Sequence, residues 1–162
     1  MFTLEEVAAH FKSAAVRCAP ELAMVVETVV STAAIRARAM IGHPQDHWPA
    51  LSGGTVEGFR HYSGRWISGK AERGFSGALG YEPLRGDSGD LERSIGSMAE
   101  GTVGEVGSTS KIAVYQEMGT PHAMYPIPPR PFLAKALEET GSIAVVEVLL
   151  EPVVLRLLVP RG

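Results

Sequence analysis

A proline-rich link in the second half of the chain constrains the fold more than any other feature of the sequence. Its prolines are Pro126, Pro128, Pro129 and Pro131. Each proline fixes the backbone angle φ and removes an N–H donor, so the link is neither an inner strand nor the interior of a helix. The pattern predicts a stiff, solvated, polyproline-like backbone that holds Phe132 and Leu133 in a fixed place. We expect a helix to begin at Pro131, because the first helical position does not need the missing N–H.

The residues before this link end an apolar segment and then turn. Ile112 and Val114 lead to Glu117, and Gly119 suits a turn. Glu117 and Arg130 are the charges that flank the turn and the link, and the planar arginine fork suits a bidentate carboxylate partner. One hypothesis is therefore that Arg130 pairs with Glu117 of its own or of a neighbouring subunit. The alternative is an exposed arginine whose ion pairing contributes about 0–1 kcal/mol.

Several short motifs occur in a fixed order between residues 83 and 139. They are Pro83-Leu84, Gly89-Asp90-Leu91, Ser94-Ile95, Val106-Gly107-Ser108, Tyr-x-Glu-x-Gly-Thr at 115–120, Pro-Pro-Arg-Pro-Phe-Leu at 128–133 and Ala-Leu-Glu-Glu at 136–139. This series resembles the tail-component family of long-tailed bacteriophages, whose members sit at the neck between the DNA-filled head and the tail. The virion-morphogenesis family of Mu-like phages is similar in the same order and shares a Trp-x-x-Leu segment, here residues 48–51. Both families stay open, and the order of the motifs is more specific than any one of them.

The resemblance implies a structural virion protein, made in the cytoplasm of a bacterial host, that forms a ring at the head–tail junction. The ring is a homo-oligomer, expected to be a hexamer, between a head-closure or connector protein and a tail terminator or tail tube protein. Packaged DNA passes through its lumen. The resemblance assigns a subunit or partner interface to Tyr115, Glu117, Gly119, Thr120, Pro128, Pro129, Arg130, Pro131, Phe132 and Leu133. An alternative is a tail terminator or minor tail protein that controls tail assembly.

The N-terminal part of the sequence has the pattern of a long helix over residues 3–41. Thr3 and Glu6 form a capping box, apolar residues then recur every three or four positions, and Gly42 is a stop signal. Pro20 removes one helical hydrogen bond, so we expect a kink or two separate helices. A continuous helix favours an arm that packs on neighbouring subunits, whereas two helices would fold on one core.

Residues 43–88 are rich in glycine and have little periodicity, so we expect a long loop or arm. A local positive bias and two tryptophans favour a surface that contacts a partner or DNA. The alternative is a solvated loop whose tryptophans anchor it to the core. The residues of this candidate surface are Trp48, Arg60, Arg65, Trp66, Lys70 and Arg73.

The remaining residues are expected to form a small antiparallel sheet of two to four strands. The expected elements are a strand or a short helix leading into one at 91–98, a turn at 100–102, a return strand at 103–106, a second turn at 107–110, and a strand or helical turn at 111–116. A sheet this small needs helices or another subunit to cover it.

Two helices are expected at the C-terminal end, the first from Pro131 to Glu139 with a break at Gly141. The second is expected over 142–151. It is apolar on most faces, so self-association is the better explanation of how it is buried. Residues 153–159 follow a proline, are rich in valine and leucine, and predict a further strand.

Together these patterns predict an α+β fold in a single domain of residues 1–162. Its expected parts are an N-terminal helical segment over 1–42, kinked near Pro20, a Gly-rich arm over 43–88, and a sheet plus C-terminal helix over 89–162.

Charge and hydropathy exclude some classes of partner. Charged residues make up 20% of the chain, the net charge is −3 and the pI is about 6.0, so the chain has no overall basic footprint for nucleic acid. The N-terminus lacks the basic start and apolar run of a signal peptide. The most apolar stretch, 143–159, is interrupted by charges and a proline, so we expect no membrane partner. Cys18, the single cysteine, lies on the apolar stripe of the first helix and fits the core better than a nucleophile.

No constellation of residues predicts catalysis, a metal site or a cofactor. His43, Asp46 and His47 have a metal-like composition, but the flanking glycine and proline argue against the helix that their spacing requires. Ser108 and Lys111 match the Ser-x-x-Lys pattern of acylating hydrolases without the companion motifs. The carboxylates that more often cap or solvate a turn are Asp87, Asp90 and Glu92.

Two functions of other classes remain as alternatives. One is a regulatory or toxin–antitoxin-like protein that binds nucleic acid through the basic Gly-rich loop. The other is a hydrolase that uses Ser108 and Lys111. Neither explains the motif series of residues 83–139.

Overall fold

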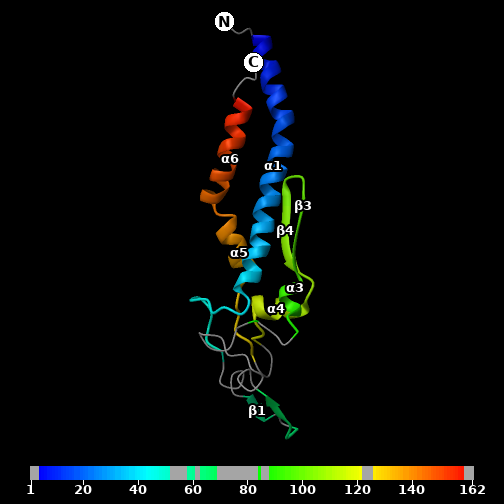
Figure 1. Ribbon diagram of the computed structural model, residues 1–162, viewed down its shortest axis with the longest axis vertical. Coiled ribbons are helices and arrows are strands. Elements are labelled where there is room, and N and C mark those ends of the chain that lie inside the picture. The colour runs from blue at the N-terminus through cyan, green and yellow to red at the C-terminus, as the bar shows by residue number, and fades with distance from the viewer. Residues whose placement is uncertain are drawn as a thin grey trace. The chain divides into compact units, whose positions relative to one another are not determined.

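The computed structural model describes residues 4–51, 58–60, 63–68, 84, 88–121 and 126–158 (Figure 1). The helices are α1 (Leu4–Met40), α3 (Asp90–Arg93), α4 (Lys111–Met118), α5 (Leu133–Thr140) and α6 (Ile143–Leu158). The strands are β1 (Gly58–Arg60), β2 (Trp66–Ser68), β3 (Ile95–Glu100) and β4 (Val103–Ser108), and β1 pairs with β2 and β3 with β4. This architecture confirms the expected α+β fold with a long N-terminal helix, small antiparallel sheets and C-terminal helices.

The long helix α1 is a single element that runs through Pro20, so the alternative of two helices is wrong. The proline removes one hydrogen bond, to the carbonyl of Val16, and the remaining bonds of a 37-residue helix hold it together. The helix ends just before Gly42, as predicted. Gly42 has a φ of +87°, and the N–H of His43 donates to the carbonyl of Met40 at 3.2 Å.

The chain divides into two compact units, and each is described by itself. Unit 1 comprises residues 1–34, 96–107 and 136–162, and unit 2 comprises residues 35–95 and 108–135. The buried side chains of unit 1 include Val30, Ala33, Ala34, Ala136, Thr140 and Val153. Those of unit 2 include Ala37, Met40, Ile41, Trp48, Leu91, Ile95, Ala113, Arg130 and Phe132. The single domain expected from the sequence stays a prediction.

In unit 1, β4 lies directly against α1 at Gly104. A Cβ atom at Gly104 would lie 2.5 Å from Cγ1 of Val30 and 2.8 Å from Cγ1 of Val26. Glycine therefore permits a close approach of strand to helix. The segment Lys12–Met40 has the length and apolar composition of a membrane-crossing helix, a test that core helices of soluble proteins also pass. The contacts at Gly104 show that part of this segment packs against protein.

The predicted order of elements after residue 89 is confirmed up to α4. The short helix α3 leads into β3, Gly101 turns with a φ of +57°, and β4 returns. The second turn is shorter than predicted, because Gly107 and Ser108 belong to β4. Residues 111–116, left open between strand and helical turn, are helical in α4, whose first turn is capped by Ser110 through the N–H of Ile112.

The Gly-rich arm contains a short antiparallel hairpin that the sequence did not predict. In it β1 and β2 pair Phe59 with Ile67 and Arg60 with Trp66. The hairpin was missed because each strand has three residues, which is too short to show an alternating pattern.

Two predictions about the C-terminal helices are wrong. Helix α5 begins at Leu133 rather than at Pro131, and residues 153–158 continue α6 instead of forming a strand. Pro152 lies inside α6, where it removes one hydrogen bond without ending the helix. The break at Gly141 is confirmed, and its N–H donates to the carbonyl of Leu137 at 2.7 Å.

Candidate functional site

The candidate site is the segment of residues 115–133, which lies in unit 2. Its carboxylate, Glu117, caps the start of α5. Oε2 of Glu117 accepts the backbone N–H groups of Phe132 at 2.9 Å and Leu133 at 3.0 Å, and Oε1 accepts that of Ala134 at 2.8 Å. These are N–H groups that a helix start leaves without partners, and the negative charge also suits the helix dipole. The side chain from α4 thus replaces a local capping residue.

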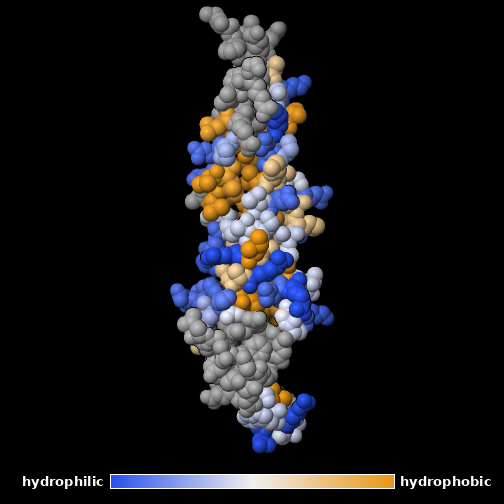
Figure 2. Space-filling model, in the orientation of Figure 1, coloured by the Kyte–Doolittle hydropathy of each residue, from blue (hydrophilic) through white to orange (hydrophobic). Residues whose placement is uncertain are grey.

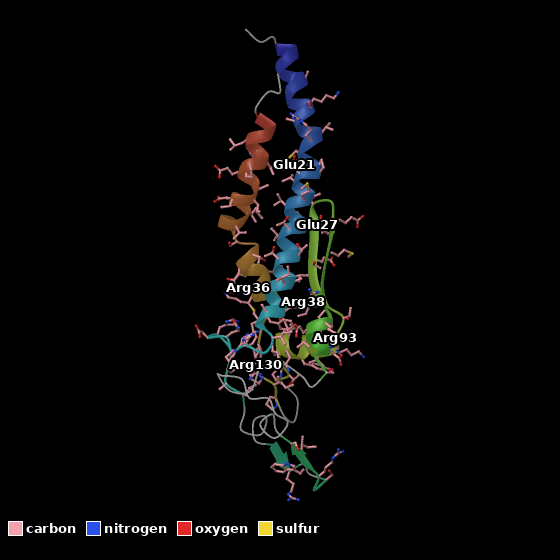
Figure 3. All side chains as sticks on the ribbon, in the orientation of Figure 1. Glu21, Glu27, Arg36, Arg38, Arg93 and Arg130 are labelled. Carbon is pink, nitrogen blue, oxygen red and sulfur yellow. The ribbon has the colours of Figure 1, made fainter. Side chains whose placement is uncertain are left out.

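Arg130, which is labelled in Figure 3, extends from the proline-rich link. It is buried, with 5% of its surface exposed. Its Nη2 donates to the carbonyls of Pro49 at 3.1 Å and Ala50 at 3.2 Å, and its backbone N–H donates to the carbonyl of Gln116 at 2.6 Å. Its Nε is buried without a hydrogen-bond partner. Burial lowers the pKa of the Arg130 guanidinium.

These contacts correct both predictions for Arg130. The pair with Glu117 of the same chain is wrong, because the carboxylate is taken up by α5 and the guanidinium by two carbonyls. The alternative of an exposed arginine is wrong as well. Arg130 instead connects the proline-rich link to Pro49 and Ala50, in the segment that follows α1.

Gly119 and Thr120, in the turn after α4, contact Ile127 in the proline-rich link. Gly119 has φ +72° and ψ 179°, and a Cβ there would lie 2.7 Å from the carbonyl oxygen of Ile127. Thr120 donates its N–H to the carbonyl of Ile127 at 2.9 Å and accepts the N–H of Ile127 on Oγ1 at 2.8 Å. Backbone geometry that favours glycine and a pair of hydrogen bonds therefore fix the turn and the link to each other.

Trp48 and Phe132 anchor the same segment to the core of unit 2. The indole Nε1 of Trp48 donates to the carbonyl of Pro131 at 3.1 Å, and Phe132 is fully buried. His47 packs edge-on against Trp48, and its Nε2 lies 3.4 Å from the same carbonyl. Trp48 is therefore an anchor to the core, as in one of the two alternatives left open by the sequence, and not an exposed part of the candidate partner surface. Within the part of the chain that the structure describes, no cluster of three or more potential metal ligands occurs.

Helix α4, of which residues 115–118 belong to the segment, has an exposed apolar side. Ala113 of α4 is buried, and Glu117 turns inward to α5. The exposed side chains, which we call the α4 face, are Ile112 (52% exposed), Val114 (57%), Tyr115 (50%) and Met118 (73%). Pro128 and Pro129 are also exposed, and Pro129 adjoins Gly119 at the end of α4. Of the ten motif residues, Tyr115 and these two prolines are therefore the exposed ones.

The candidate basic surface is partly visible on the β1–β2 hairpin. Arg60 and Trp66 are paired across the strands, Arg65 precedes Trp66, and all three are exposed. Nη1 of Arg60 donates to the carbonyl of Gly64 at 3.1 Å. Lys70 and Arg73 lie outside the described residues.

Of the residues considered for catalysis, Ser108 has structural contacts. Oγ of Ser108 lies 2.6 Å from Oγ of Ser94 and accepts the N–H of Ser110 at 3.1 Å, which ties the end of β4 to the start of β3. Lys111 is exposed. Cys18 is half-buried on α1. The Ser94 hydroxyl in turn donates to the carbonyl of Leu91.

Two acidic residues, Asp90 and Glu92, lie in the first turn of α3. The hydroxyl of Ser88 and the guanidinium of Arg93 donate to Asp90, and together they hold the pKa of its carboxyl below its usual range. Asp87 lies outside the described residues, and Glu92 is exposed. Nearby, Arg38 of α1 donates to the carbonyl of Ile95 (Figure 3).

Comparison with protein family models, with curated proteins and with solved structures found no match.

Proposed function

We propose that this chain is a structural virion protein that forms a homo-oligomeric ring at the head–tail junction of a tailed phage. The ordered motifs of residues 83–139 support the class of protein. The observation that supports adhesion is the α4 face, an exposed apolar surface on a helix whose end Glu117 and Gly119 fix to the start of α5 and to the proline-rich link. Exposed apolar patches of this kind mark interaction sites in soluble proteins.

In this proposal the motif residues have two roles. Glu117, Gly119, Thr120, Arg130 and Phe132 shape the segment from inside. The α4 face and the exposed prolines make the contact. A preformed surface loses less conformational entropy when it binds, so the rigid interior strengthens the contact. A mildly acidic ring also suits a lumen through which DNA must pass, since a basic one would retain it.

The test is deletion of the gene from its phage, followed by negative-stain microscopy of the lysate. Full heads beside separate, finished tails are the expected result. Heads without tails, or tails of uncontrolled length, would support the alternative of a tail terminator or minor tail protein. Normal infectious particles would overturn the structural role. Complementation with Met118→Glu is expected to fail, whereas Glu105→Gln, an exposed change on β4, is expected to restore joining.

A nucleic-acid-binding regulatory protein is the second candidate, and the exposed Arg60, Arg65 and Trp66 of the hairpin favour it. Arginines beside an aromatic ring suit the backbone and bases of a single strand. Salt-dependent binding of a labelled oligonucleotide that Arg60→Ala and Arg65→Ala together abolish would support this candidate. Negligible binding by both the natural sequence and the double variant would count against this candidate.

A further inference from the structure

Helix α6 carries a second exposed apolar surface, in unit 1. Its inner side is buried at Val153 and half-buried at Val146, Leu149 and Leu150. Its outer side shows Val145 (38% exposed), Val148 (70%), the exposed Pro152 and Leu155 (56%), which we call the α6 face. Figure 2 shows hydrophobic residues gathered over α6.

The spacing of the α6 face is that of a helix–helix seam. Val145, Val148, Pro152 and Leu155 are separated by three, four and three residues, which places them in one stripe along the helix. The inner stripe is buried or half-buried, so the outer stripe is the exposed apolar side of α6.

We infer that the α6 face of one copy packs against the α4 face of the next copy. The inference rests on the proposed ring. Charge favours this pairing: the α4 face has the exposed Lys111 beside it, and α6 has the exposed Glu147 and Glu151 along one edge. With Arg156, α6 carries a net charge of −1 from two glutamates and one arginine. Two α6 helices would bring acidic edges together, whereas α4 brings a lysine to them.

The symmetry of a ring favours the same pairing. Contact between two α6 faces would be isologous and would end at a dimer. Contact between α6 and α4 uses two different surfaces of each copy, so it is heterologous and continues from copy to copy until a ring closes. The two faces belong to different compact units of the chain, and each copy offers both.

The area of the two faces predicts a weak contact between free copies. Eight aliphatic or aromatic side chains, about half exposed, offer roughly 240–480 Å² of apolar surface in all, taking about 60–120 Å² for a complete side chain. Stable pairs bury about 1,200–2,000 Å², so a single contact is expected to form at high protein concentration and to become stable when the ring closes.

The test is disulfide trapping between two single-cysteine proteins, both in a Cys18→Ser background. One carries Met118→Cys on the α4 face and an affinity tag, and the other carries Val148→Cys on the α6 face. Because each protein has one cysteine, every disulfide joins two copies. At concentrations of hundreds of micromolar, the mixture is expected to give mainly the mixed dimer. Each protein alone is the control and is expected to give little disulfide-linked dimer.

Charge exchange gives the second arm of the test. Lys111→Glu is expected to lower the yield of the mixed dimer several-fold, and Glu151→Lys on the other protein is expected to restore it. A dimer from Val148→Cys alone that exceeds the mixed dimer would overturn the inference in favour of an α6–α6 contact. No disulfide in any mixture would overturn it as well.

The two proposals fail separately. Loss of head–tail joining in the gene deletion together with no mixed dimer would leave the proposed function and remove this contact. A mixed dimer together with normal particles in the deletion would leave the contact between copies and remove the neck function.

Discussion

The carboxylate of Glu117 accepts the backbone N–H of Phe132 at 2.9 Å, across fifteen residues of sequence. Phe132 directly precedes α5 and has no side-chain acceptor, so the helix start depends on a residue of α4. The same carboxylate also accepts the backbone N–H groups of Leu133 and Ala134. One side chain therefore fixes the position of α4 relative to the start of α5 within unit 2.

Removal of this cap is expected to destabilise the fold. Glu117→Ala should lower the free energy of unfolding by about 1–2 kcal/mol, as for other N-cap losses. Glu117→Gln keeps an acceptor oxygen but loses the charge, so a smaller loss is expected. Urea denaturation measures both. The control is Glu105→Ala, an exposed residue of β4, expected to change stability by less than about 0.5 kcal/mol. Equal effects of Glu117→Ala and the control would contradict the capping role.

Elements with strong local signals could be predicted from the sequence. The apolar stripe of α1, its stop at Gly42 and the turn at Gly101 all depend on neighbouring residues, and all are found. The role of Glu117 could not be predicted, because its partners lie fifteen to seventeen residues away. The one available signal was the lack of a capping side chain before α5.

The continuation of α6 and the burial of Arg130 were missed for a different reason. Pro152 was taken as a helix end, but packing of α6 at Val153 outweighs one lost hydrogen bond. A proline-flanked arginine was expected to be exposed or ion-paired. Its carbonyl acceptors, on Pro49 and Ala50, belong to a distant segment that no local pattern connects to it.

Arg130 is expected to stabilise the fold through these carbonyls. Arg130→Ala should lower the free energy of unfolding by about 2–3 kcal/mol, the range for hydrogen bonds to a charged group. Arg65→Ala, at an exposed arginine of the hairpin, is the control and should have little effect. Because Arg130 and Glu117 use separate partners, the coupling energy in the double mutant should be below about 1 kcal/mol. A larger coupling energy would support a direct ion pair between Arg130 and Glu117.

Gly119 is expected to tolerate no side chain. Its φ of +72° with ψ 179° is a region that essentially glycine alone adopts, and a Cβ would overlap the carbonyl oxygen of Ile127. Gly119→Ala should therefore cost about 2–4 kcal/mol, from backbone strain and steric overlap together. Gly101→Ala separates the two effects, since Gly101 has φ +57° and open space around it. It should cost about 1 kcal/mol. Thermal melts measure both variants, and equal losses of Tm for Gly119→Ala and Gly101→Ala would mean that steric overlap plays no part.

Gly104 should show a steric effect that a second change relieves. Gly104→Ala pushes a Cβ into Val30 and should destabilise unit 1 by about 1–3 kcal/mol. Val30→Ala removes the methyl group at 2.5 Å and leaves Cγ1 of Val26 at 2.8 Å. The double mutant is therefore expected to be more stable than the sum of the single effects predicts, with part of the loss remaining. Gly96→Ala, with nothing within 4 Å of its Cβ, is the matched control. Additive effects would show that the strand moves away from α1 instead.

Asp90 should make stability depend on pH in the acidic range. Ser88 and Arg93 hold its pKa in the folded chain below the ordinary value of 3.8. Between these two pKa values the unfolded chain binds more protons than the folded chain, so stability rises with pH there. The contribution is fully present above pH 3.8 and is lost as pH falls through the folded pKa.

Asp90→Asn is therefore expected to lower Tm at pH 7, with a difference from the natural sequence that shrinks as pH falls below 3.8. Thermal melts from about pH 2 to pH 7 measure this, a range that spans the carboxyl titration. Ser97→Ala, at an exposed residue of β3 without a titratable side chain, is the control and should give a Tm difference that hardly varies with pH. A Tm difference for Asp90→Asn that stays constant to the lowest pH would contradict the role of the carboxylate charge.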